Sequence, residues 1–165
     1  MKTLKCIETR RSIRKYKDKR ISCKIIDKIL KAAVCAPSGK NGQPWRFKVI
    51  SDKNVINNIA ALSIYESWMR TAPCFILVFL DKSRSYDYVK DVQSCGAAIQ
   101  NIILCAHSLN IGSCWIGEIL PKAGSVKSLA KISNDSLELM GIVALGYSNG
   151  KPSRRMRKDI SAFLV

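Results

Sequence analysis

The apolar residues of the chain recur at two different spacings, which predicts a mixture of helices and strands. Steps of three and four residues give one apolar face over 22–37, with Ser22 as the expected N-cap. The same spacing over 91–109 predicts a long helix that is apolar nearly all round, so it should be the most buried helix or lie in a subunit interface. Shorter helices are expected over 4–9, after Asp52, and over 126–132.

Three further apolar stretches predict strands. Residues 45–50 (WRFKVI) alternate like a half-buried strand, and a last strand is expected over 139–147. The run 74–80 (CFILVFL) is short and apolar on both faces, so it predicts a central strand covered by helices on each side. Because helices and strands are mixed without a repeat or a linker, we expect one layered domain over residues 1–165.

The composition is that of an ordinary globular protein. Of the 165 residues, 47% are hydrophobic and 24% are charged, and a chain of this length can bury about 70% of its unfolded surface. Nothing resembles a signal peptide or a transmembrane span, so a cytoplasmic protein is expected. The seven cysteines never have C-x-x-C spacing and His107 is the only histidine, which predicts reduced core thiols and no metal site.

The net charge of +16 suggests an anionic partner: nucleic acid, a membrane surface or a small anionic ligand. Lysine and arginine are dense in 10–31 and in 151–158 but absent from 91–121. The charge thus forms two clusters that are distant in sequence, and both can bind the same anion if the fold brings them together. A solvated surface is the alternative for most of these side chains. Only Tyr16 lies among the N-terminal cations, which argues against a nucleic-acid surface with interleaved aromatic residues.

Four short segments have the chemistry of a binding site, and each also has a purely structural interpretation. In 10–14 (RRSIR), three guanidinium groups and a hydroxyl suit a phosphate, unless they are solvated surface. The amide-rich loop 37–45 (PSGKNGQPW) suits a planar ligand, or caps its own backbone. Segment 112–118 (GSCWIGE) presents backbone N–H groups, or is a tight turn with Trp115 in the core. The arginines of 151–158 bind an anion or belong to a frayed terminus.

The sequence lacks the side chains of several common mechanisms. It has no Ser-His-Asp set, no P-loop, no G-x-G-x-x-G and no paired carboxylates in an uncharged setting. This shortage of acid and base groups favours a reaction carried by a bound cofactor.

In their order and spacing, four segments resemble the flavin-dependent nitroreductase family. The resemblance covers nearly the whole chain, and the first three segments are specific in combination. They are RRSIRKY (10–16), ILKAAVCAPSGKNGQPWRFKVI (29–50), CGAAIQNIILCAHSLNIGSCWIG (95–117) and LMGIVALGYSNGKPSRR (139–155).

The resemblance implies an α+β fold with a central, mostly antiparallel sheet flanked by helices, and an intimate homodimer with FMN at the subunit interface. It also implies an enzyme that takes hydride from NADH or NADPH onto flavin N5 and then, by a ping-pong cycle, reduces an electron-poor acceptor such as a nitroaromatic or a quinone. A flavin carrier or sensor without turnover and, less well supported, a nucleic-acid-binding protein are the alternatives.

Carried over residue by residue, the resemblance implies a cofactor site without a catalytic side chain. Arg10 would contact the phosphate with Ser12 beside it, and Arg14 would reach the pyrimidine edge of the ring. Pro37, Ser38 and Gly39 would form a loop lent to the partner's flavin, and the backbone of Ile116 and Gly117 would face N5. The other implied contacts are Arg11, Asn41, Gln43, Trp115, Arg154 and Arg155, with Arg157 as a substitute for either of the last two.

This sequence is also shorter than typical members of the family. The stretches 50–74 and 80–91 are brief, and in many relatives they cover the substrate side of the flavin. We therefore expect an open active site.

Overall fold

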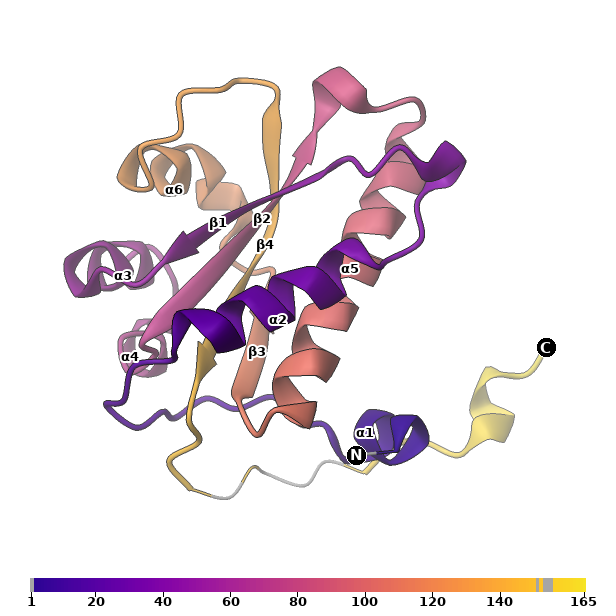
Figure 1. The fold of residues 1–165 in the computed structure, drawn as a ribbon, viewed down its shortest axis with the longest axis horizontal. Helices are drawn as coiled ribbons and strands as arrows, with labels where there is room; N and C mark the ends of the chain where they lie inside the picture. Colours follow the sequence, from indigo (N-terminus) through magenta and orange to yellow (C-terminus); the bar gives the residue numbers. More distant parts are fainter. Residues whose placement is uncertain (1, 151, 153–155) are drawn as a thin grey trace.

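An antiparallel sheet with the strand order β1-β2-β4-β3 lies at the centre of the fold (Figure 1). The computed structural model describes residues 2–150, 152 and 156–165. The four strands in this part of the chain are β1 (Trp45–Ile50), β2 (Cys74–Asp81), β3 (Gly112–Ile116) and β4 (Leu137–Gly146). The two longest strands, β2 and β4, are the inner ones, so β1 and β3 form the edges.

Helices cover both faces of the sheet, as the two-sided apolar run of β2 predicts. The face of Ile76 and Val78 packs against α2 (Cys23–Val34) and α5 (Tyr88–Ser108). The face of Phe75 and Leu77 packs against α3 (Lys53–Ala60), α4 (Glu66–Met69) and α6 (Ala123–Leu129). All side chains of β2 are buried, because alternate residues enter two different hydrophobic clusters.

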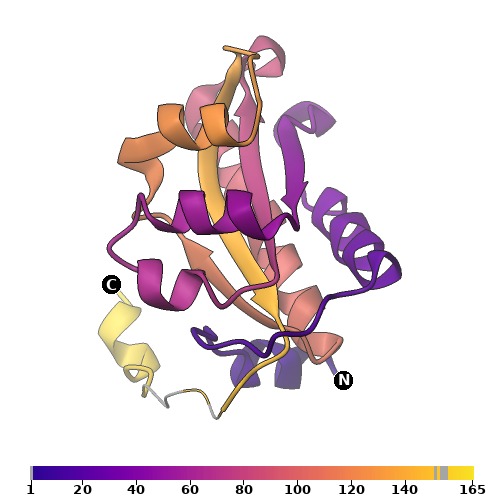
Figure 2. The same ribbon diagram turned by 90° about the vertical axis from the view of Figure 1, so that its left-hand side faces the viewer.

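The two ends of the described chain lie on the same side of the domain. Helix α1 (Thr3–Thr9) packs on the last turns of α5, where the Cys6 thiol is 3.4 Å from the Leu104 carbonyl oxygen. In Figures 1 and 2 the described part of the tail, with one short 3-10 turn (Ile160–Phe163), lies at the same lower end of the domain as α1. The N-terminal and C-terminal cationic segments therefore share one end of the molecule.

Most predicted elements are confirmed, with small shifts in their bounds. Helix α5 begins at Tyr88, three residues before the prediction, because the Asp87 carboxylate accepts a hydrogen bond from the Lys90 N–H and caps the helix there. Asp52 caps α3 in the same way. Ser22 precedes α2 as predicted, but its hydroxyl makes no capping hydrogen bond.

Two elements differ from the sequence-based interpretation. Residues 112–116 form the edge strand β3, paired with β4, where a tight turn had been one alternative. The short helix α4 was not predicted at all. Trp115 is 44% exposed, so its alternative placement in the core is wrong. None of the described helices has the length and apolar character needed to cross a membrane.

Candidate functional site

Backbone pairing holds the segment 10–17 against the edge of the sheet. After α1 the chain passes β3, where the Ile13 N–H donates to the Ser113 carbonyl oxygen at 2.9 Å. It then meets the segment after β4, where the Lys17 N–H donates to the Tyr147 carbonyl oxygen at 2.8 Å. Tyr16 is buried between these two contacts and its hydroxyl donates to the Ile13 carbonyl oxygen at 2.6 Å. The cationic motif is thus fixed to the core although it has no regular secondary structure.

Several arginines gather at this end of the molecule, and within the described part of the chain they form no ion pair with a carboxylate. Burial, and next the neighbouring guanidinium groups of Arg157 and Arg11, lower the pKa of Arg10. None of the ion pairs within 2–150, 152 and 156–165 involves Arg10, Arg11, Arg14 or Arg157. Mutual repulsion among unpaired cations is relieved by an anion, so this arrangement is suited to binding one.

The individual side chains of the motif have different surroundings. Arg11 donates to the carbonyl oxygens of Glu8 and Arg10, at 2.6 and 2.8 Å, and so caps the end of α1. Ser12 and Arg14 lie beside the thiol of Cys114; burial raises the pKa of that thiol more than these two neighbours lower it. Arg11 is therefore engaged with the backbone in this structure, whereas Ser12 and Arg14 border open space.

A cavity of about 180 Å³ joins the N-terminal motif to the chain after β4. Its lining comprises Ser12, Ile13, Arg14, Lys15, Ser148, Asn149, Gly150 and Pro152. The structure therefore brings the two cationic segments together, with Arg157 as the described arginine of the second one. Arg154 and Arg155 lie outside the described residues.

The loop 37–43 has an unusual backbone. Lys40, Asn41 and Gln43 all have left-handed φ angles, of 52, 55 and 48°, and each such residue costs about 1 kcal/mol or more. The Ser38 hydroxyl accepts a hydrogen bond from the Gln43 N–H at 3.0 Å, and the Gln43 amide donates to the Asn41 carbonyl oxygen at 3.3 Å. Part of the predicted polar chemistry thus serves the loop itself, while Pro37 and the side chain of Asn41 are exposed.

Within one subunit, the loop and the cations lie at opposite ends of α5. The loop residues Pro37, Ser38 and Gly39 border a cavity of about 330 Å³ with the first turns of α5. The arginines lie near His107, in the last turn. A helix of 21 residues is about 30 Å long, and Figure 1 shows the two segments at its two ends. One subunit alone does not bring them to a common site.

The end of β3 offers backbone rather than side chains. Ile116 is buried among the residues that contact α3 and α6. Gly117 is exposed, and apart from its own atoms and those of its two chain neighbours no described atom lies within 4 Å of the position that a Cβ would take there. The indole of Trp115 lies over Gly141, where a Cβ would stand 2.6 Å from Nε1, and Trp115 also borders Gly96 of α5. The segment thus combines an exposed aromatic ring with open space beside a peptide group.

We predict that His107 reports on anion binding. Its Nε2 is 2.9 Å from the Thr9 hydroxyl, and burial, followed by Arg10 and Arg11, lowers the pKa of His107 below its ordinary value of 6.5. An anion bound at Arg10 should raise this pKa, because it offsets the cationic repulsion. As the only histidine, His107 can be titrated by NMR. A midpoint of 6.5 or above, or one that phosphate moves no more than sodium chloride at equal ionic strength, would contradict the prediction.

Two contacts of the loop were missed by the sequence reasoning. The ring of Tyr86 lies over Gly39, and Arg46 forms a 2.9 Å ion pair with Asp81 beside the end of the loop. The acid at the end of the apolar strand β2 was a usable signal, because a carboxylate in such a place needs a partner.

Comparison with known proteins gives one consistent relationship. The family model described as "Nitroreductase family" matches residues 7–64 and 61–147. A protein of Archaeoglobus fulgidus with the provisional name NADH dehydrogenase/NAD(P)H nitroreductase is 40% identical over 147 residues, covering 87% of this chain and 84% of the relative. A protein of the same provisional name from Methanothermobacter thermautotrophicus is 36% identical over 157 residues, covering 94% and 82%.

A solved structure agrees with these relatives. The crystal structure of a provisionally named nitroreductase from Desulfovibrio desulfuricans, in complex with FMN, superposes with a TM-score of 0.94 and 37% sequence identity, covering 100% of this chain and 96% of that one. The expected α+β fold, with an antiparallel sheet flanked by helices, is thereby confirmed. The chain belongs to the nitroreductase family.

Proposed function

We propose that the protein is an FMN-dependent NAD(P)H oxidoreductase that acts as a homodimer, with residues 1–165 forming one FMN-binding domain. The observation that carries the proposal is the group formed by Arg10, Arg157 and Arg14, the last beside the same Cys114 thiol as Arg10, which has no carboxylate partner among the described residues. A relative with the same fold holds FMN, whose phosphate is the kind of anion that such a group binds.

The residues present fit an elongated molecule with a phosphate at one end and a ring at the other. Arg10, Ser12 and Arg157 would hold the phosphate by charge-assisted hydrogen bonds, each worth about 1.5 to 3 kcal/mol. From Ser113, beside these cations, β3 runs to Gly117 over roughly 13 Å of extended chain. Arg14 would donate to the pyrimidine edge of the ring, near which Trp115 supplies an exposed aromatic surface.

When bound, FMN supplies the redox chemistry, accepting hydride at N5 from NADH or NADPH and passing it to an electron-poor acceptor such as a quinone or a nitroaromatic. The chain itself binds and orients. The backbone N–H groups of Ile116 and Gly117 would present a preorganised dipole to N5, with no titrating side chain required. The open space beside Gly117 would admit donor and acceptor in turn, which is the requirement of a ping-pong cycle.

A second subunit would complete the site. Because the loop 37–43 and the arginines lie at opposite ends of α5, the loop of one subunit can reach the cofactor of the other only in a dimer. The exposed apolar residues of the tail support such an assembly: Ile160, Phe163, Leu164 and Val165. The seven free thiols support a cytoplasmic location.

The test is the visible spectrum of the purified protein. We expect a yellow protein, or one that becomes yellow with added FMN, and we expect anaerobic NADH or NADPH to bleach it. Addition of a quinone should then restore the colour. A protein that takes up no FMN would overturn the proposal, and a yellow protein that neither nucleotide bleaches would instead be the flavin carrier.

A further inference from the structure

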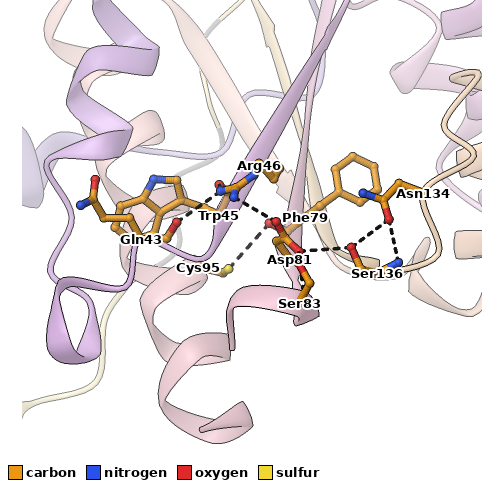
Figure 3. Close-up of polar contacts among 9 residues, drawn as sticks. All are labelled: Gln43, Trp45, Arg46, Phe79, Asp81, Ser83, Cys95, Asn134 and Ser136. Carbon is orange, nitrogen blue, oxygen red and sulfur yellow. Dashed lines mark hydrogen bonds and ion pairs between the residues drawn. The ribbon is translucent and has the colours of Figure 1, made fainter. Parts of the chain in front are cut away.

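The loop 37–43 is held by an ion pair that lies outside the loop. Arg46, the second residue of β1, donates from Nη1 to the carbonyl oxygens of Trp45 and Gln43, at 2.7 and 3.3 Å. Its Nη2 is 2.9 Å from Oδ2 of Asp81, at the end of β2 (Figure 3). One planar guanidinium thus joins the end of the loop to the central strand, a geometry that lysine cannot reproduce.

Asp81 is itself fixed by hydrogen bonds. Its side chain is only 9% exposed, and Oδ1 accepts from the Ser83 hydroxyl at 2.6 Å, the Ser83 N–H at 3.2 Å and the Ser136 hydroxyl at 3.1 Å. These bonds and the nearby Arg46, the Ser83 hydroxyl most of all, lower the pKa of Asp81, so the group is a carboxylate at neutral pH. Both oxygens have partners, and the carboxylate therefore gives Arg46 a rigid anchor.

The strained part of the loop lies directly beside this anchor. Gln43 has a φ of 48°, and a left-handed residue keeps its conformation only where its surroundings hold it. Arg46 bonds the carbonyl oxygen of Gln43, and the Asp81 N–H bonds that of Pro44 at 2.8 Å. Both external bonds to the end of the loop thus involve Asp81, directly or through Arg46.

The segment after Asp81 supports the start of the loop as well. The Tyr86 ring lies so close over Gly39 that a Cβ there would stand 2.2 Å from the Tyr86 hydroxyl oxygen. The Tyr86 N–H donates to the Asp91 carboxylate at 3.1 Å, which ties the segment to α5. Asp81 therefore supports the end of the loop, and Tyr86, held by Asp91, supports its start.

We propose that Arg46 and Asp81 are positioning residues for the cofactor ring: they fix the conformation in which the loop 37–43 meets a flavin bound by the partner subunit. The inference rests on the proposed function, because it needs a flavin beside the loop. It assigns these residues to the ring and not to the phosphate, because the charge of Arg46 is already paired with Asp81 and is not free for a phosphate.

The test compares two ligands, FMN and riboflavin, which share the ring and differ in the phosphate. Arg46→Gln and Asp81→Asn should each weaken the binding of both ligands by roughly ten-fold, the loss of about one hydrogen bond to a charged group. The ratio of the two dissociation constants should stay at its wild-type value. The matched control is Arg70→Gln, which removes the same charge from the exposed Arg70–Glu66 pair of α4 and should leave both affinities unchanged.

A conservative variant separates positioning from general stability. Arg46→Lys keeps the charge opposite Asp81 but cannot also bond two carbonyl oxygens in one plane. It should retain the thermal midpoint of the flavin-free protein and still lose affinity for both flavins. Suppose that the wild type binds both flavins. If the Arg46 variants then bind them as tightly as the wild type, or lose affinity only in proportion to a loss of folded protein, the inference is overturned while the proposed function stands. If the wild type binds neither flavin, the proposed function fails and the inference with it.

Discussion

Replacement of Arg10 by glutamine should weaken FMN binding by about 10- to 100-fold and leave riboflavin binding nearly unchanged. Arg10 is partly buried, lies near Arg11 and Arg157, and has no carboxylate partner among the described residues. A dianionic phosphate gains most from a guanidinium that is already desolvated and held in place, since little further ordering is then needed. Fluorescence titration of the flavin-free protein with each ligand measures both dissociation constants.

The effect should belong to this position and not to net charge alone. Arg84→Gln removes one positive charge from an exposed site in the 3-10 turn after β2 and should change FMN affinity less than two-fold. Equal losses in the two variants, or a loss of riboflavin binding as large as that of FMN in Arg10→Gln, would place the phosphate elsewhere.

The sequence was informative wherever local pattern decides structure. The apolar run 74–80 of β2 predicted its central position, because a strand covered on both faces carries apolar residues at consecutive positions. The spacing of Ile26, Ile29 and Ala33 predicted the buried face of α2. Asp52 marked the start of α3, since a carboxylate before a helical pattern caps the first free N–H groups.

The elements that were missed depend on contacts between distant parts of the chain. Segment 112–116 is only five residues long and begins with glycine and serine, so its local pattern does not specify a strand, yet β4 provides its pairing partner. The indole of Trp115 can lie over Gly141 because glycine has no side chain, and Gly141 is remote from Trp115 in the sequence. The left-handed loop likewise depends on Asp81 through Arg46, and no local pattern predicts an ion pair 35 residues apart.

In the candidate site, too, local sequence predicted the chemistry of the residues, whereas contacts between distant segments determine their positions. The residue types of segment 10–14 indicated an anion, but the pairing of Ile13 with Ser113 is what places them at the edge of β3. The brief stretch 80–91 had suggested only a missing cover over the substrate. In the structure this stretch carries Tyr86 and Asp91, which support the loop 37–43. The short stretch 80–91 therefore helps to position the loop 37–43, although it is too brief to cover the substrate side of a flavin.

Removal of residues 159–165 should convert the proposed dimer to a monomer at micromolar concentration and weaken FMN binding at least a hundred-fold. In the single subunit Phe163 is 65% exposed and Leu164 71%, so the deletion leaves the core of each subunit intact. Burial of an apolar side chain of this size contributes about 1.5 to 3 kcal/mol. Loss of two such side chains per subunit should therefore raise the dimer dissociation constant by more than about a hundred-fold. Analytical ultracentrifugation and flavin titration measure the two effects.

A full-length variant tests whether apolar burial is the cause. Replacing Ile160, Phe163 and Leu164 by serine keeps the chain length, the Asp159 cap of the last turn and every cation, so it should reproduce the deletion. The two losses should be linked, because the loop 37–43 and the arginines of one subunit lie at opposite ends of α5 and only a dimer brings them to one flavin. A truncated protein that is monomeric but binds FMN as tightly as the full chain would show that one subunit holds the cofactor unaided.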